Sequence, residues 1–445
     1  MNGKLLKGFA VVAIFAMLLG ACGPAATTEA PPPTEAPVAP TEAPAAPPTE
    51  APPKEIPINI GIKGPLTGPA ARTGQEILDA YIMAFEEIDY TVGPYKITLI
   101  PIDSQSDPEK ATRAYEDAIV RDGIIAGAGG WHSSVAVALM EVVAKHKVPH
   151  FFSAGETDVV NEKFQSDPEK YGYWMAKGWP TPKSLVSKNY FDGFNDLIAK
   201  GEWTPANKKI AIACEETDFG RAVAEPLAQL MSDAGWEVVG PDYFPLEEVE
   251  FHPLLTKYKS ENVAVTVVTD TATAGISAFT KQAKEMRVPG LLVMHGLGWV
   301  GEWYSLVGEA SDGVLDQIPQ LGTPAALEWA KNFETKWGMK PSPSAGGLAY
   351  DWAHFFINIL KATYEEKGEL TSESIYNFGK EKLWTGEITY TDGIVMPMYK
   401  FTPETIPDPV VGKEAFIFPI IQYKGGESKI IWPLDWAQAK LEVPK

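Results

Sequence analysis

The chain has 445 residues, of which 45% are hydrophobic, and its 13 tryptophans add to a composition that can bury a large core. A globular part of this length predicts two domains or two lobes rather than one. The formal net charge of -20 argues against binding to nucleic acid or to anionic lipid headgroups, because both carry the same sign of charge.

The first residues predict export from the cytoplasm. Lys4 and Lys7 precede an apolar run over residues 9–19, which is shorter than the roughly 20 residues that a membrane-spanning helix needs. The run ends in Leu-Gly-Ala-Cys, and this sequence resembles a bacterial lipobox. The resemblance implies cleavage of residues 1–21 and a lipid anchor on the thiol of Cys22. An uncleaved anchor or an ordinary secretory signal are the alternatives.

Residues 22–55 form a segment of different composition. Thr-Glu-Ala-Pro occurs four times, starting at Thr28, Thr34, Thr41 and Thr49. A segment rich in Pro, Ala, Thr and Glu cannot bury a core, so we expect a disordered tether. In polyproline form it would reach roughly 100 Å from the bilayer.

From residue 56 onward, the hydrophobic pattern predicts strands that alternate with helices. Strands are expected at 58–62, 96–102, 123–127 and 148–152, and again at 209–214, 237–239, 263–268 and 290–293. Asp107-Pro108-Glu109 has the composition of a helix start. These residues belong to the hexapeptide Gln-Ser-Asp-Pro-Glu-Lys at 105–110, which recurs at 165–170. We interpret the two copies as two helix caps rather than a duplication. Such alternation predicts an α/β protein with two parallel sheets flanked by helices.

A glycine-rich loop over residues 127–134 is the strongest local candidate for a binding site. It lacks the lysine of a phosphate-binding loop and the third glycine of a dinucleotide fingerprint. Ser133 and Ser134 would instead join the free N–H groups of a helix start, which suits one carboxylate or a similar anion. Alternatively, either serine is only a helix N-cap, and the local sequence leaves both interpretations open.

No pattern in the chain predicts catalysis, a metal or a cofactor. His146 and His150 are separated by Pro149, the other four histidines are scattered, and no hydrolase or metalloprotease motif is present. Cys214 ends a short apolar strand, which is typical of a buried, unreactive thiol. Trp179 and Trp299 belong to aromatic groups that serve either as packing or as the lining of a cleft for an apolar ligand.

Five stretches together resemble a known family. They lie at 60–75, 103–111, 129–134, 148–155 and 218–220. Their order and composition resemble type I periplasmic solute-binding proteins of ABC transporters, in the branch that binds leucine, isoleucine and valine. With the lipobox, the resemblance implies a binding protein, not an enzyme. It would be monomeric and anchored outside the cytoplasmic membrane, and it would pass a small carboxylate to an ABC permease.

The family's fold implies two α/β lobes joined by three hinge crossovers and closing on ligand. We expect the crossovers near residues 177, 316 and 387. Lobe 1 would then comprise 56–177 and 317–387, and lobe 2 would comprise 178–316 and 388–445. The same fold also serves as a ligand-sensing receptor domain, but a sensor usually continues into a transmembrane segment. The chain ends at Lys445 with no second apolar span, which favours transport.

The resemblance also implies a set of ligand-binding residues. Ser133 would bind the ligand carboxylate, Gly155 and Thr157 the polar ends of the ligand, and Phe219 would cover it from lobe 2. Arg72 and Thr73 would lie near the ligand side chain. The expected set is Arg72, Trp131, Ser133, Ser134, Gly155, Thr157, Asp218, Phe219 and Thr271.

One position departs from the family pattern. Leu297 stands where members that bind amino acids present an acidic residue to the α-ammonium group, and Thr271 replaces a frequent tyrosine. A buried ammonium without a carboxylate partner costs several kcal/mol. Either Asp270 or Glu156 replaces the missing acid, or the ligand is an aromatic or aliphatic acid or an amide.

Overall fold

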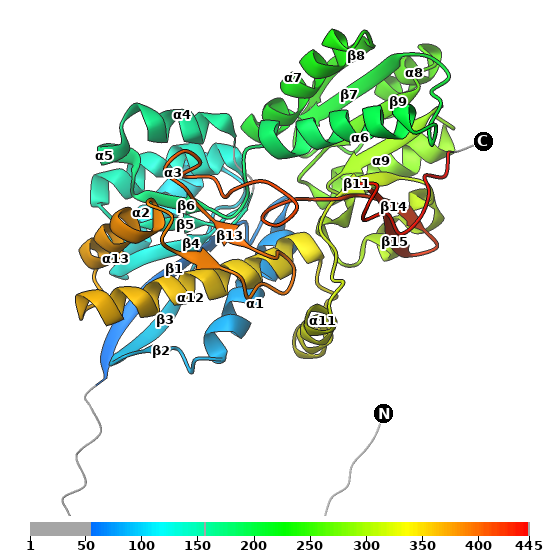
Figure 1. Ribbon diagram of the computed structural model, residues 1–445. Coiled ribbons are helices and arrows are strands. Elements are labelled where there is room, and N and C mark those ends of the chain that lie inside the picture. Colours follow the sequence, from blue (N-terminus) through cyan, green and yellow to red (C-terminus); the bar gives the residue numbers. More distant parts are fainter. Residues whose placement is uncertain (1–54, 155–156, 444–445) are drawn as a thin grey trace, which may run out of the picture. The chain divides into compact units, whose positions relative to one another are not determined.

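The computed structural model describes residues 55–154 and 157–443. The signal, the tether with Cys22, and the loop residues Gly155 and Glu156 lie outside the described residues. Contacts divide the chain into two units, and the described residues belong to the second, Pro53–Lys445. This unit contains two mainly parallel sheets with helices on both faces (Figure 1), which confirms the predicted α/β fold.

The first sheet forms the centre of lobe 1 and has the order β2-β3-β1-β4-β5-β6. Its strands are β1 (Ile56–Gly64), β2 (Thr91–Val92), β3 (Tyr95–Asp103), β4 (Ile124–Gly129), β5 (His150–Phe152) and β6 (Trp174–Lys177). All neighbours are parallel except β2 and β3. The carboxyl ends of β1, β4 and β5 therefore lie at one edge, where their following loops carry the predicted site.

The second sheet forms the centre of lobe 2 and has the order β15-β14-β11-β10-β9-β7-β8. Its strands are β7 (Lys209–Glu215), β8 (Glu237–Phe244), β9 (Val265–Thr269), β10 (Leu291–His295), β11 (Leu315–Gln317), β14 (Ile420–Lys424) and β15 (Glu427–Trp432). β14 and β15 join as an antiparallel hairpin. The eight predicted strands thus correspond to strands of the structure, with ends that differ by a few residues.

Helices cover both sheets. In lobe 1 they are α1 (Ala71–Glu86), α2 (Pro108–Val120), α3 (Ser133–His146), α4 (Asp158–Ser166), α5 (Pro168–Tyr171), α11 (Pro324–Trp337), α12 (Leu348–Lys367) and α13 (Ser372–Phe378). In lobe 2 they are α6 (Lys188–Ala199), α7 (Asp218–Asp233), α8 (His252–Ser260), α9 (Thr273–Glu285) and α10 (Trp303–Val307). Asp107 caps α2 and Asp167 caps α5, so both copies of the hexapeptide start a helix as predicted.

Three segments connect the lobes. The first follows β6, and the second follows β11 and leads into α11. After α13, the chain forms β12 (Thr389–Tyr390) and β13 (Tyr399–Lys400), which remain against lobe 1. The carboxylate of Asp351 on α12 accepts hydrogen bonds from the backbone N–H groups of residues 394–396 at 2.7–3.0 Å. Residues 389–400 therefore lie against lobe 1, and the chain next enters the second sheet at β14; the position of the third crossover stays a prediction.

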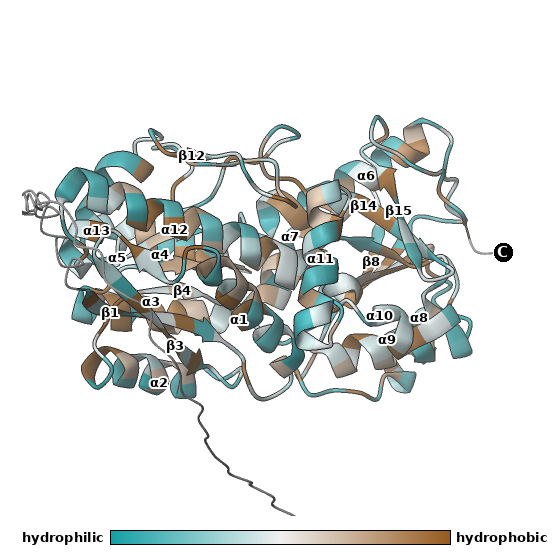
Figure 2. Ribbon diagram, turned by 90° about the horizontal axis from the view of Figure 1, so that it is seen from below, coloured by the Kyte–Doolittle hydropathy of each residue, from teal (hydrophilic) through white to brown (hydrophobic). Residues whose placement is uncertain are grey.

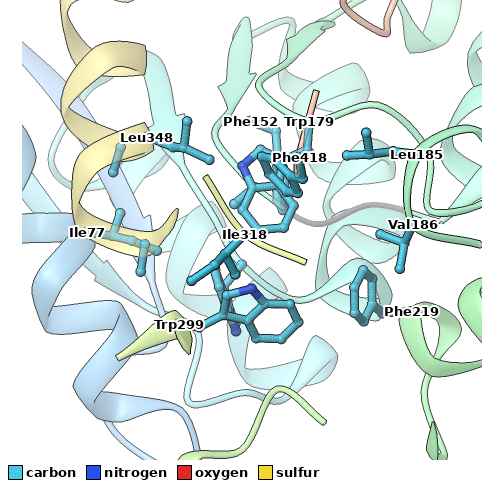
Figure 3. Packing of buried hydrophobic residues seen from close by; sticks show 14 of the residues in the cluster. Ile77, Phe152, Trp179, Leu185, Val186, Phe219, Trp299, Ile318, Leu348 and Phe418 are labelled. Atoms are coloured by element: carbon cyan, nitrogen blue, oxygen red, sulfur yellow. The ribbon is translucent and has the colours of Figure 1, made fainter. Parts of the chain in front are cut away.

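Hydrophobic residues concentrate on the strands and on the helix sides that face them (Figure 2). Cys214, at the end of the β7 core, is fully buried, as its sequence context predicts. The apolar core continues between the lobes, where Figure 3 shows Trp179, Trp299, Phe219 and Phe418 together. This continuity places the predicted loops in a closed boundary between two hydrophobic cores.

Candidate ligand-binding cleft

The loops that follow the strands of the two lobes meet across a narrow boundary. The backbone N–H of Asp218, at the start of α7, donates a hydrogen bond of 3.2 Å to Oγ of Ser134 on α3. Beside it, Nδ1 of His132 lies 3.4 Å from Oγ1 of Thr271. Three of the expected binding residues, and His132 beside a fourth, thus form direct contacts between lobe 1 and lobe 2.

Ser133 occupies the first turn of α3 at this boundary. It is 1% exposed, and its hydroxyl has no hydrogen-bond partner among the described residues. The side chain of His132 does not cap the helix, so the hydroxyl lies beside unused N–H groups of a 14-residue helix. A buried hydroxyl and a helix N-terminus at one place provide donors for an anionic group.

Lys63 places a positive charge near this helix start. It is the penultimate residue of β1, it is fully buried, and its Nζ lies 4.4 Å from the ring centroid of Phe152. Burial, together with the charge of Lys63, lowers the pKa of His132 to about 3. The imidazole is therefore neutral at neutral pH.

Two buried carboxyl groups end the strands on the lobe 2 side. Glu215 accepts hydrogen bonds from the backbone N–H and Oγ1 of Thr271, both at 2.5 Å, and from Oγ1 of Thr217 at 2.6 Å. Asp270 accepts one from the N–H of Ala272 at 2.8 Å. Burial raises the pKa of both groups, and the nearby charge of Glu215 raises the pKa of Asp270 further.

Aromatic side chains fill the space between these polar ends. Trp131 follows β4, Trp179 lies in the first crossover, and Trp299 lies in a short helical turn after β10. Their ring centroids are 5.2–6.2 Å apart, and Phe219 on α7 lies 5.9 Å from Trp299. Figure 3 shows that Trp179, Trp299 and Phe219 come from different segments to one place. The boundary therefore combines an aromatic centre with neutral donors.

Two open crevices flank the Ser134–Asp218 contact. One, of about 530 Å³, is lined by Thr157, Asp158 and Thr181 together with Asp218 and Arg221 of α7. The other, of about 500 Å³, is lined by Ser134 and by the loop after β8. Thr157 also caps α4 through its hydroxyl, which accepts a hydrogen bond from the N–H of Val159. The predicted binding residue Gly155 lies outside the described residues.

Arg72 forms a contact between the lobes. Its Nη2 donates to both carboxylate oxygens of Glu302 at 2.7–2.8 Å and to the backbone oxygen of Lys340 at 2.9 Å. Its Nη1 donates to Glu76 at 2.7 Å. Protein acceptors thus engage the guanidinium on several sides, and its contact with ligand stays a prediction.

Some residues at the boundary were missed by sequence reasoning. Lys63, Glu215 and His295 are each a polar residue at or next to the carboxyl end of an apolar strand. Nε2 of His295 is buried without a hydrogen-bond partner among the described residues, and its ring lies 4.9 Å from that of Trp299. Polar residues that terminate buried parallel strands are the signal that could have identified all three.

The described residues contain no group of three or more His, Cys, Asp or Glu side chains that could hold a metal ion. Among the same residues, none of the helices combines the length and the apolar composition needed to cross a membrane. The arrangement offers donors, a buried positive charge and an aromatic surface. These features suit reversible binding of a small molecule.

The model of the family described as periplasmic binding protein matches residues 57–392. The chain belongs to this family. Family membership confirms the resemblance of the strand-end loops, and it makes the chain an extracytoplasmic solute-binding protein rather than an enzyme.

Individual relatives support the same family and fold. Over 219 residues the chain is 25% identical to a Leu/Ile/Val-binding protein of Rhizobium johnstonii. This alignment covers 47% of this chain and 53%, about half, of the length of that relative. A substrate-binding protein from Streptococcus pneumoniae, solved in complex with isoleucine, has a TM-score of 0.64 at 16% identity, covering 84% of this chain and 98% of its own. A solute-binding protein from R. palustris, solved with benzoate, has a TM-score of 0.67 at 16% identity, covering 84% and 95%.

Proposed function

We propose that this protein is a lipid-anchored solute-binding protein that captures a small carboxylate-bearing molecule between its lobes and delivers it to an ABC importer. The lobes would close by rotation about the three crossovers. Relatives in the family are named for branched-chain amino acids, and solved structures of the same fold contain isoleucine or benzoate. Both ligands carry a carboxylate, the group that the start of α3 is suited to bind.

The buried hydroxyl of Ser133 is the observation that carries this proposal. Leaving a buried hydroxyl without a partner costs about 1–3 kcal/mol, so a ligand that accepts its hydrogen bond recovers that free energy. The hydroxyl lies in the first turn of α3 and near the charge of Lys63, and both favour an anionic acceptor. The contact between Ser134 and the N–H of Asp218 would then form on closure.

The test is a thermal-shift screen of the purified protein against branched-chain amino acids, aromatic acids, short aliphatic acids and amides. A ligand at about 100 times its dissociation constant should stabilise the protein by about 2.7 kcal/mol. We expect Ser133→Ala to weaken binding of the responding ligand about tenfold, the effect of losing a hydrogen bond to a charged group. Ser277→Ala, which removes an unpartnered buried hydroxyl from the interior of α9, is the matched control and should bind normally. Unchanged affinity in Ser133→Ala would place the ligand elsewhere.

The lipid anchor is a separate part of the proposal. Its support is the sequence Leu-Gly-Ala-Cys at 19–22, followed by the long Pro-rich tether. Attached acyl chains would hold the protein at the membrane while the tether lets the lobes reach a permease. In cell fractionation, Cys22→Ser should move the protein from the membrane fraction to the soluble fraction. Retention of Cys22→Ser in membranes would show another mode of attachment.

A further inference from the structure

The tryptophan triad, Trp131, Trp179 and Trp299, is the least explained feature of the cleft. The three residues come from lobe 1, the first crossover and lobe 2, and each is only 2–3% exposed. Trp131 and Trp299 meet edge to face at 5.2 Å with an interplanar angle of 89°. Because they belong to opposite lobes, separation of the lobes exposes an indole surface on each side of the cleft.

The indole N–H groups of all three triad residues are buried and lack a hydrogen-bond partner among the described residues. Buried tryptophans usually find an acceptor, and an unsatisfied buried donor costs about 1–3 kcal/mol. Trp329 and Trp337 share this condition, but they lie on α11 and outside the aromatic centre. Three unsatisfied donors in one cluster at a ligand cleft indicate that the ligand brings acceptors to them.

The lobe 2 side offers little for a cationic group. Leu297, in the short helical turn after β10, is fully buried and offers no charge. Both oxygens of Glu215 already accept hydrogen bonds from Thr217 and Thr271. Oδ2 of Asp270 has no hydrogen-bond partner among the described residues, but it faces the first turn of α9, since a Cβ added to Gly275 would lie 2.1 Å from it. Burial and the nearby Glu215 raise the pKa of Asp270, which favours its neutral form. Among the described residues, an ammonium placed here would therefore lack an ionised carboxylate as its own partner, at a cost of several kcal/mol.

We propose that the tryptophan triad is the subsite that selects the ligand, an inference that rests on the proposed function. The ligand is a planar aromatic carboxylate rather than an α-amino acid. Its ring packs between the indoles of the two lobes and replaces the direct contact of Trp131 with Trp299. Its carboxylate lies at the start of α3, where the hydroxyl of Ser133 and the helix N-terminus favour an anion. The indole N–H groups donate hydrogen bonds to the carboxylate or to oxygen substituents on the aromatic ring.

The test uses isothermal titration calorimetry with matched pairs of ligands. L-Phenylalanine is compared with 3-phenylpropanoate, and L-leucine with 4-methylpentanoate, so that each pair differs only in the amine. Benzoate and cyclohexanecarboxylate compare a planar ring with a puckered one. We expect each acid without an amine to bind at least tenfold more tightly than its amino acid, because the ammonium lacks a partner. Benzoate should bind about tenfold more tightly than cyclohexanecarboxylate, because aromatic contacts add to burial.

Two variants connect this preference to the triad. Trp299→Phe and Trp131→Phe each keep an aromatic ring but remove the indole N–H donor. Because one lies in each lobe, the second variant still tests the inference if the first folds poorly. We expect each to weaken benzoate binding about three- to tenfold, the effect of one lost hydrogen bond. The matched control is Trp329→Phe, which removes an unpartnered indole N–H from α11 and should leave binding unchanged.

Several results would overturn the inference. These are binding of L-leucine as tight as that of 4-methylpentanoate, equal affinity for benzoate and cyclohexanecarboxylate, no binding of either aromatic acid, or unchanged affinity in both triad variants. Failure here is distinguishable from failure of the proposed function. If another carboxylate binds and Ser133→Ala weakens it, the cleft remains the binding site and only the assigned ligand class is wrong.

Discussion

Individual residues at the strand ends determine the chemistry of this cleft. Lys63 is the penultimate residue of β1 on the lobe 1 side, whereas on the lobe 2 side Glu215 ends β7 and Asp270 follows β9. The two sides therefore differ in charge, although the chain as a whole is acidic. A single buried lysine can oppose the net charge locally, because charges interact more strongly where water is excluded.

Cys214 lies next to Glu215 but has no place in binding. Burial raises the pKa of its thiol to about 12, so at pH 8 the thiol stays protonated, and only the thiolate reacts as a nucleophile. In a Cys22→Ser background, we expect a disulfide reagent to label no cysteine of the native protein at pH 8. Unfolding in urea should expose one reactive thiol. Rapid labelling of the native protein would contradict the described burial.

At the scale of elements, local sequence signals determine where a helix starts, whereas contacts between helices determine how the helices pack together. The starts of α2 and α5 follow from their capping aspartates, which are local. By contrast, Glu141 on α3 accepts hydrogen bonds from Lys163 on α4 and Tyr171 on α5 at 2.6–2.8 Å, and it forms an ion pair with Lys170 at 2.9 Å. Such a junction of three helices has no signature in the sequence.

This junction makes a prediction about acid stability. Hydrogen bonds from Lys163 and Lys170 lower the pKa of Glu141 from 4.5 to about 2. A lowered pKa stabilises the fold above pH 4.5, and the contribution is lost as the pH falls toward 2. Because the side chain is half exposed, we expect Glu141→Gln to lower the free energy of unfolding by at most about 1 kcal/mol at pH 6.

Urea unfolding between pH 6 and pH 2 measures this difference. The gap between Glu141→Gln and the unaltered protein should close as the pH falls from 4.5 toward 2, because Glu141 takes up its proton near pH 4.5 in the unfolded protein but only near pH 2 in the folded protein. Glu162→Gln on α4 is the control, since Glu162 is exposed and has no ion pair within the described residues. A gap that stays constant with pH would show that Glu141 contributes by packing rather than by charge.

At the scale of the whole molecule, the two lobes are joined by more than the cleft. We call the contact of Arg72 with Glu302 and the backbone of Lys340 the interlobe bridge. Glu302 also accepts a hydrogen bond from the N–H of Lys340 at 2.8 Å. A Cβ added to Gly301 would lie 2.1 Å from the backbone oxygen of Lys340, so the lobe 2 loop approaches lobe 1 closely at this point.

The interlobe bridge should change the affinity for every ligand by the same factor and so leave the preference among ligands unchanged. If it favours the closed state, its loss lowers the binding-competent fraction and scales all dissociation constants by one factor. For Glu302→Gln we expect affinity for each ligand to fall two- to tenfold, consistent with loss of about 0.4–1.4 kcal/mol. Glu109→Gln, which breaks the exposed ion pair with Arg113, is the control and should bind normally. Calorimetry with two different carboxylates tests this; a change for only one of them would instead indicate direct ligand contact.

The sequence by itself determined what depends on neighbouring residues. Strand and helix periodicity, the caps at Asp107 and Asp167, and the loops after β4 and β5 are local features, and they sufficed for the α/β fold and for the family. Only the tertiary structure decided which groups meet. Arg72 bonds Glu302 from 230 residues away, residues 394–396 bond Asp351 rather than lobe 2, and three distant tryptophans converge. These contacts join side chains that lie far apart in the chain, and such side chains leave no periodic pattern from which their meeting can be predicted.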